Sequence, residues 1–443
     1  MKYKSYTLRN FREIPQIVKL RKDERFAIEV VGSVLPFKTN NYFVDELVDW
    51  DDPQGDPMFR LNFPQKDMLE PADFIRMAGL IGEGAERSEI TEAANAIRMS
   101  LNPHPAGQME KNVPVHNGRR LEGIQHKYRE TVLFFPSQGQ TCHSYCTFCF
   151  RWPQFVGMGD LRFASSEVDA LIGYIRAHPE VSDLLITGGD PMVMGAKTFS
   201  MYIDRILGAN IEHLRTIRIG TKSLAYWPYR YTTDEDAPDL LRTLGKITQS
   251  GRHLAFMAHF NHPRELGTHA VKDAIRLIKD TGAEIRTQSP ILRHINDDPK
   301  VWSSMWRAQV KLGLIPYYMF QVRNTGAQHY FSLPLVQSWD IFREAYQNVS
   351  GIARTVRGPS MSAEPGKVRV VGVTEVEGQE VMVLQMLQGR NPEWVLWPFF
   401  AEYDDKAQWL DELKPAFGHE KFFFEDEEAV DPHHQLRLQI NEL

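Results

Sequence analysis

The sequence predicts an α/β protein whose centre is a partial barrel of six strand–helix units, with a mainly helical extension before it and a shorter extension after it. From about residue 130, short runs rich in β-branched and aromatic residues alternate with longer amphipathic stretches, at steps of roughly 30–50 residues. Such alternation indicates parallel strands joined by crossover helices. Six units suit an open barrel better than a closed eight-stranded one, and we expect the chemistry at the carboxyl ends of the strands.

The chain divides into three parts on this interpretation. Residues 1–125 form the helical extension, with helices at 23–34 and within 71–101. Residues 126–345 form the barrel, with strands at 131–136, 183–187, 216–220, 254–259, 284–288 and 315–321, and helices at 167–178, 198–208, 239–250, 269–281 and 299–312. Residues 346–443 hold a Gly/Pro/Ser-rich loop at 357–367, a strand pair at 368–374 and 380–385, and an acidic tail that we expect to be solvated.

Composition excludes several classes of function. The 443 residues carry a net charge of −6, which argues against a broad surface for nucleic acid. No apolar run reaches the roughly 18 residues that span a bilayer, and the first residues do not resemble a signal peptide. We therefore expect a cytoplasmic protein without a membrane partner.

The three cysteines of the chain, Cys142, Cys146 and Cys149, lie in one short loop after the first barrel strand. An odd, clustered set is a poor disulfide framework and a better ligand set in a reducing compartment. Thiolates suit zinc or iron–sulfur clusters. A zinc site usually takes four protein ligands, for which His143 is the available fourth. A [4Fe–4S] cluster on three cysteines leaves one iron open, as a catalytic cluster needs. Free buried thiols are the remaining alternative.

The CxxxCxxC order resembles the signature of radical S-adenosylmethionine (SAM) enzymes, and the fold implied is their partial barrel. The resemblance implies that the open iron binds SAM and that one electron, from a reduced flavodoxin or ferredoxin-like donor, releases a 5′-deoxyadenosyl radical. A second landmark is Gly188, Gly189 and Asp190, at the end of the second strand. It resembles the Gly-Gly-Glu element that contacts the amino group of SAM in these enzymes.

More specifically, the chain resembles the lysine 2,3-aminomutase family over roughly residues 30–385. The resemblance is carried by LPF (35–37), HKY (126–128), YCTFCFR (145–151), LLITGGDP (184–191), RIGTK (218–222), HFNHP (259–263) and TQSPILRHIND (287–297). It implies an enzyme, an isomerase that uses pyridoxal 5′-phosphate (PLP) held as a Schiff base to a lysine. The amino group of the substrate then moves from C2 to C3. Family members are often homo-oligomers, which implies the same here.

The resemblance also implies roles for individual residues. Lys367, in the run EPGKVRV, matches the lysine that holds PLP, although the family's run of glycines before it is missing. Lys127 and Tyr128 match an Arg-Tyr pair at the phosphate, and Thr131 replaces a second arginine there. Gln288 matches a polar residue at the pyridoxal ring. Arg151 matches the arginine that pairs with the α-carboxylate of the substrate.

Two positions depart from the lysine-specific pattern. Where those members hold the distal ammonium of lysine with two aspartates, this chain has Arg323 and Ser360. A buried arginine repels an ammonium and attracts a carboxylate. We therefore predict a substrate other than lysine, with glutamate or aspartate as the first choice. A register shift of one residue would place Asn324 there and favour a neutral polar side chain.

Some members bind zinc through additional cysteines near the C-terminus, and because this chain lacks those cysteines we expect no zinc site of that kind. His259 and His262 are interpreted as structural, since HFNHP is a family motif without a metal. Two other hypotheses stay open. The chain could be a radical enzyme of the same build acting on a protein side chain or biosynthetic intermediate, or a non-enzymatic iron–sulfur or zinc module.

Overall fold

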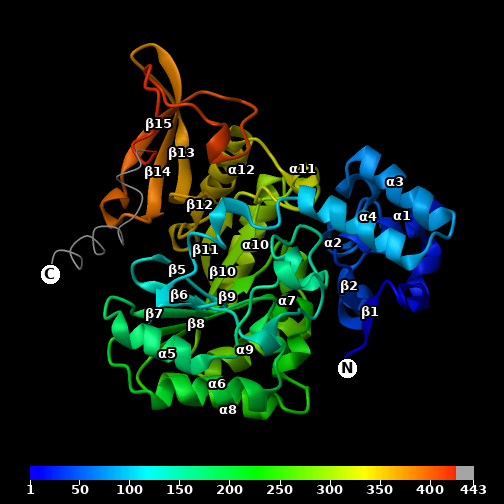
Figure 1. Cartoon of the computed structure of the whole chain (residues 1–443), viewed down its shortest axis with the longest axis horizontal. Helices are drawn as coiled ribbons and strands as arrows, with labels where there is room; N and C mark the ends of the chain where they lie inside the picture. Colours follow the sequence, from blue (N-terminus) through cyan, green and yellow to red (C-terminus); the bar gives the residue numbers. More distant parts are fainter. Residues whose placement is uncertain (426–443) are drawn as a thin grey trace.

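The computed structural model describes residues 1–425, and its centre is one eleven-stranded sheet in the order β15-β14-β13-β12-β11-β10-β9-β8-β7-β6-β5 (Figure 1). Seven of these strands follow one another in chain order and pair in parallel: β6 (Thr131–Phe134), β7 (Asp183–Ile186), β8 (Thr216–Thr221), β9 (His253–His259), β10 (Glu284–Pro290), β11 (Ile315–Phe320) and β12 (Arg357–Ser362). The predicted α/β class is therefore confirmed, and the parallel run continues one strand beyond the six that were predicted.

Helices join the parallel strands, each burying one apolar face. They are α5 (Val168–Ala177), α6 (Ala196–Gly208), α8 (Ala237–Gln249), α9 (His269–Asp280), α10 (Pro299–Lys311) and α12 (Leu335–Gln347). Helix α9 is typical, because its buried residues recur at helical spacing: Val271, Ala274, Ile275 and Ile278. The hydroxyl of Thr268 caps this helix by accepting from the amide of Val271 at 3.3 Å.

The sheet curves back on itself. Strand β5 (Ile124–Tyr128) lies at one edge, and β13 (Gly366–Val376) lies eight strand positions away. In a flat sheet these two strands would be about 38 Å apart, at about 4.8 Å per strand. Instead, the Lys127 ammonium on β5 donates to the carbonyl of Ala363, just before β13. This curvature brings residues from both ends of the sheet into one site.

The N-terminal helices pack against one side of the sheet and share its core (Figure 1). They are α1 (Lys22–Val34), α2 (Pro57–Asn62), α3 (Pro71–Gly82) and α4 (Arg87–Ser100). Val31 of α1 and Ile97 of α4 belong to the same buried cluster as Ile186 of β7. The predicted helical stretch 71–101 is two helices, because the chain turns between them at Gly84, whose φ of +72° ends the first helix.

The C-terminal part extends the sheet with antiparallel strands β13, β14 (Gln379–Gly389) and β15 (Pro398–Glu402). Residues 357–362 were expected in a loop but form β12. A Cβ atom at Gly358 would lie 2.4 Å from the carbonyl oxygen of Met319, so the missing side chain lets β12 approach β11. The predicted solvated tail, residues 426–443, lies outside the described residues. None of the described helices is both long and apolar enough to cross a membrane.

Candidate active site

The three cysteines lie in the loop that leaves the carboxyl end of β6, as predicted. The loop is tightly wound at its end, because the amide of Cys149 donates to the carbonyl of Cys146 at 3.1 Å. All three thiols are free and partly buried. Burial raises the pKa of Cys146 to about 11, although the charge of Lys222 and the Tyr226 hydroxyl act against it. Burial, followed by the charge of Cys146, raises the pKa of Cys149 to about 12. A bound iron–sulfur cluster would reverse this, because metal coordination deprotonates a thiol.

The N-terminal extension holds the cysteine loop from outside the barrel. The Lys38 ammonium donates to the carbonyl of Cys142 at 2.7 Å. The side-chain nitrogen of Asn40 donates to the carbonyl of His143 at 3.2 Å and to the hydroxyl of Ser144 at 2.8 Å. The Asn62 side chain donates to the carbonyl of Tyr145 at 2.6 Å. These contacts fix the loop backbone, and no sequence pattern had indicated them.

The donor set fits a polynuclear cluster. Within residues 1–425, no three Cys, His, Asp or Glu side chains lie close enough to hold a single metal ion. An iron–sulfur cluster does not require its three cysteines on one ion, because each of them binds a separate iron. His143, the other candidate ligand, packs edge-on against Tyr3 and its buried Nδ1 has no hydrogen-bond partner. Burial lowers the pKa of His143 to about 3, so its ring is neutral.

Gly188, Gly189 and Asp190 follow β7, directly beside the start of the cysteine loop. A Cβ atom at Gly189 would lie 2.5 Å from the carbonyl oxygen of Thr141, so this glycine lets the two segments touch. The Asp190 carboxylate is buried and accepts from the Thr221 hydroxyl at 2.7 Å and from the amides of Met192 and Lys222, each at 2.9 Å. Burial raises its pKa to about 6. Asp190 thus ties the ends of β7 and β8 together.

Lys367 projects from β13 into a group of aromatic rings. Its ammonium lies 4.1 Å from the ring centroid of Tyr318, 5.5 Å from that of Phe320 and 6.0 Å from that of Tyr128. Burial lowers the pKa of Lys367 to about 7, assisted by the positive charges of nearby arginines. A lysine with this pKa presents a neutral, nucleophilic amine near neutral pH, which is the form that attacks a carbonyl.

Positive charges gather around the turn that precedes Lys367. Besides Lys127, they include Arg390, which donates to the carbonyl of Glu364 at 2.9 Å and to the side chain of Asn112 at 2.6 Å. Burial, and next the charges of Arg390, Arg323 and Lys367, lower the pKa of Lys127 well below its usual value. Arg390 was missed by the sequence analysis, since it lies beyond the matched motifs. A cluster of cations around one turn suits a phosphate group.

The guanidinium groups of Arg151 and Arg323 both lie near the ring of Phe150, at 5.0 and 4.8 Å from its centroid. Burial, followed by the charge of Arg323, lowers the pKa of Arg151 to about 9. Neither guanidinium forms an ion pair with an acidic side chain of residues 1–425; Arg323 donates to the carbonyl of Ser362 at 3.3 Å. Among residues 1–425, the site therefore holds two desolvated positive charges without an acidic counter-ion.

Two further predicted residues occupy different settings. Gln288 is partly buried on β10, between His259 of β9 and Tyr318 of β11 in the sheet register. Ser360 is fully buried, and its hydroxyl donates to the carbonyl of Met319 at 3.3 Å. This hydrogen bond joins β12 to β11 within the sheet. His259 is neutral, because burial lowers its pKa well below the usual value.

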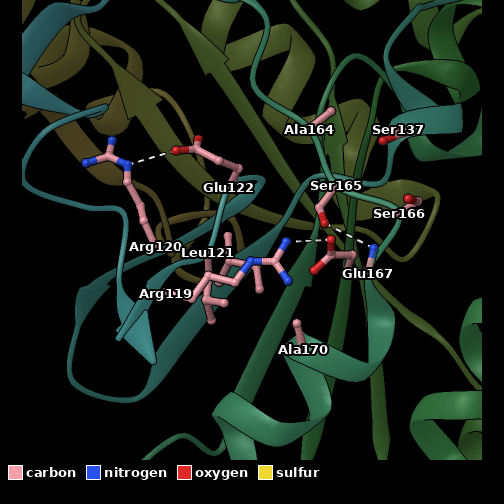
Figure 2. A pocket seen from close by; sticks show the side chains of 11 residues that line it. Arg119, Arg120, Leu121, Glu122, Ser137, Ala164, Ser165, Ser166, Glu167 and Ala170 are labelled. Atoms are coloured by element: carbon pink, nitrogen blue, oxygen red, sulfur yellow. Dashed lines mark hydrogen bonds and ion pairs between the residues drawn. The ribbon is translucent and has the colours of Figure 1, made fainter. Parts of the chain in front are cut away.

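Two cavities differ in their relation to these residues. A pocket of about 640 Å³ is lined by Asn324, Ala363 and Glu364, next to Arg323 and the Lys127 contact, and by Trp394 and Trp409. A smaller pocket lies by the turn between β3 (Val115–His116) and β4 (Arg119–Arg120), and none of the cysteines lines it (Figure 2). Its charges are matched within the pocket, because Arg119 pairs with Glu167 at 2.7 Å and Arg120 with Glu122 at 2.8 Å.

Comparison with known proteins gives the family. No protein-family model matches the chain. A putative L-lysine 2,3-aminomutase of Aquifex aeolicus is 33% identical over 361 residues, 81% of this chain and 83% of that one. The L-lysine 2,3-aminomutase of Acetoanaerobium sticklandii is 30% identical over 259 residues, 58% of each chain. These relatives place the protein among the aminomutases, a class of isomerase. The chain belongs to the L-lysine 2,3-aminomutase family, as its motifs had indicated.

Solved structures add little to this assignment. Streptococcus suis SuiB aligns with a TM-score of 0.36 and 13% identity over 64% of this chain and 59% of that one. A radical SAM methyltransferase from Sphaerobacter thermophilus aligns with a TM-score of 0.35 and 14% identity over 63% of this chain and 91% of that one. Scores at this level do not establish a shared fold.

Proposed function

We propose that this protein is a radical SAM, PLP-dependent amino acid 2,3-aminomutase whose substrate is an acidic or polar amino acid, with glutamate first, rather than lysine. The observation that carries the proposal is the pair Arg151 and Arg323, two desolvated cations over one aromatic ring without an acidic partner among residues 1–425. The strongly curved sheet supports a partial barrel that encloses this site.

Cys142, Cys146 and Cys149 would hold a [4Fe–4S] cluster, with the segment around Gly189 beside it for SAM. When bound, these groups supply a 5′-deoxyadenosyl radical after the cluster accepts one electron from a flavodoxin- or ferredoxin-like donor. The protein's own part is to keep the loop in place through Lys38, Asn40 and Asn62 and to exclude water. The Asp190 carboxylate, which accepts from Thr221 and two amides, contributes by fixing the neighbouring strand ends.

Lys367 would hold PLP, which supplies an electron sink for amino-group migration. The neutral amine of Lys367 is available at physiological pH because burial lowers its pKa to about 7. The rings of Tyr318 and Phe320 stack on each other at 4.8 Å and give a flat apolar surface beside that amine. Lys127 and Arg390, which surround the turn before Lys367, would meet the phosphate, and Gln288 would lie near the ring.

Arg151 would pair with the α-carboxylate of the substrate and Arg323 with its side-chain carboxylate. Each guanidinium offers a planar pair of donors that matches a carboxylate. A dicarboxylate would neutralise both charges, and this relief favours glutamate or aspartate. A substrate with an ammonium at its end would add a third positive charge and be rejected.

A second function, on a larger substrate such as a peptide or a biosynthetic intermediate, is favoured by one observation. The pocket of about 640 Å³ beside Ala363 and Glu364 is large enough for more than a free amino acid, and its tryptophans offer apolar contacts. This alternative uses the same cluster and the same Lys367.

The proposal is tested by anaerobic reconstitution and product analysis. Protein loaded with iron, sulfide and PLP should show broad iron–sulfur absorption and the visible band of lysine-bound PLP. Lys367→Ala should lose the second feature alone, whereas Lys414→Ala, an exposed lysine on the same C-terminal part, should keep both. Mass spectrometry after incubation with each standard amino acid should find a β-amino acid from an acidic or polar substrate. Zinc without a chromophore would contradict the proposal.

A further inference from the structure

The hydroxyl of Tyr226 contacts the sulfur of Cys146. Tyr226 ends the short helix α7 (Ser223–Tyr226), which follows β8, and its oxygen lies 3.0 Å from the Cys146 Sγ atom. The side chain is about 1% exposed, so water does not compete for this contact. A thiolate bound to iron carries no proton, so in the loaded protein the tyrosine hydroxyl must be the donor.

The packing around Tyr226 holds the hydroxyl in this place. Its ring meets Phe43 edge-on at 5.3 Å, and the Lys222 ammonium lies 4.6 Å from its centroid on another side. Asn40, which also holds the cysteine loop, donates to the carbonyl of Tyr226 at 2.9 Å. The same asparagine therefore sets the position of both partners, the loop and the tyrosine.

The nearby charge of Lys222 is already balanced. Its ammonium forms a buried ion pair with Glu265 at 2.7 Å and a hydrogen bond with Asn261 at 2.8 Å. Lys222 and Glu265 act on Cys146 through space and in opposite directions, whereas Tyr226 contacts the sulfur directly through its hydroxyl.

We propose that Tyr226 is a positioning residue that donates a hydrogen bond to the Cys146 thiolate of the bound cluster and thereby raises its reduction potential. A hydrogen bond to a ligating sulfur withdraws negative charge, and it stabilises the reduced cluster, which carries one more electron, over the oxidised one. The inference rests on the proposed function, because it requires the cluster. It assigns to Tyr226 control over how readily the protein accepts the electron that starts the reaction.

The test is a redox titration of the reconstituted, full-length protein, followed by electron paramagnetic resonance. Tyr226→Phe removes only the hydroxyl and should lower the potential, so that the ratio of reduced to oxidised cluster at a fixed potential falls about threefold to tenfold. A tenfold change corresponds to about 59 mV for one electron. The matched control is Tyr42→Phe, a buried tyrosine whose hydroxyl contacts Thr268 at 2.9 Å, and it should leave the potential unchanged.

A second change keeps the inference testable if Tyr226→Phe does not take up the cluster. Incorporation of 3-fluorotyrosine at position 226 keeps the shape and makes the hydroxyl a stronger donor, so the potential should rise. An unchanged or higher potential in Tyr226→Phe, or an unchanged or lower one with the fluorinated residue, overturns the inference. A wild-type protein that binds no four-iron cluster would instead overturn the proposed function.

Discussion

The guanidinium groups of Arg151 and Arg323 lie against the same ring, that of Phe150, at 5.0 and 4.8 Å from its centroid. The two residues come from distant parts of the chain, one after the cysteine loop and one after β11. Like charges that share a desolvated site destabilise each other unless an anion joins them. The pair therefore stores an unfavourable electrostatic energy that a bound dicarboxylate would relieve.

Replacing the second of these cations should change substrate choice. In Arg323→Gln we expect kcat/KM for glutamate to fall at least about 30-fold, because the loss of one partner of a buried charged hydrogen bond costs about 2–5 kcal/mol. Steady-state assays of β-amino acid formation measure this. Arg343→Gln, an exposed arginine on α12, is the control and should retain full activity. Equal kcat/KM values for Arg323→Gln and the wild type would remove Arg323 from the substrate site.

The rate at which the apoprotein captures PLP should depend on pH with a midpoint near 7. Below this value Lys367 is protonated and cannot attack the aldehyde; above it the amine is neutral and the rate levels off. We expect a rise of about tenfold per unit between pH 5 and 6 and little change above pH 8. Stopped-flow absorbance follows the reaction. A rate that continues to climb through pH 9 would mean that Lys367 has an ordinary lysine pKa.

Asn40 should be required for a stable cysteine loop. Its side chain donates to His143, Ser144 and Tyr226. Because the His143 carbonyl also accepts from Tyr3, two acceptors would lose their donor, at about 1–3 kcal/mol each. We expect Asn40→Ala to lower the free energy of unfolding by about 2–4 kcal/mol and to reduce the iron bound per chain.

The adjacent residue supplies the control for Asn40. Asn41 donates to the carbonyl of Lys2 at 3.1 Å in an exposed position, so Asn41→Ala should change the free energy of unfolding by less than about 1 kcal/mol. Denaturant unfolding gives the free energy of unfolding of both variants, and iron analysis gives the iron that each binds per chain. Equal behaviour of the two variants would show that the contacts of Asn40 do not support the cysteine loop.

The central parallel strands and their helices could be predicted from sequence because each carries its own periodic pattern. Strands β5 and β12 were not predicted, since IQHKY lacks an apolar run and RGPSMS contains Gly and Pro. The formation of both strands depends on pairing with a neighbouring strand of the sheet, β6 for β5 and β11 for β12. Gly358, for example, is tolerated in β12 because it allows the close approach to Met319.

The candidate site was predictable only where residues fall within motifs. The cysteines, Arg151 and Lys367 carry such signals. The convergence of Lys127 with Ala363 follows from the curvature of the whole sheet, which no local pattern encodes. Arg390 and Tyr226 reach their partners through contacts between segments that are distant in the sequence, and no local pattern marks either residue.

The central claim is that the site of this family member selects a substrate with an anionic side chain. Its most direct test is the ratio of kcat/KM for glutamate to kcat/KM for lysine in the reconstituted wild-type protein. Glutamate labelled with ¹⁵N at C2 should give a product with the label at C3, and we expect the ratio to exceed about 100, because two buried arginines without an acidic partner among residues 1–425 disfavour an ammonium by several kcal/mol. Turnover of lysine at a rate that equals or exceeds that of glutamate would contradict the account.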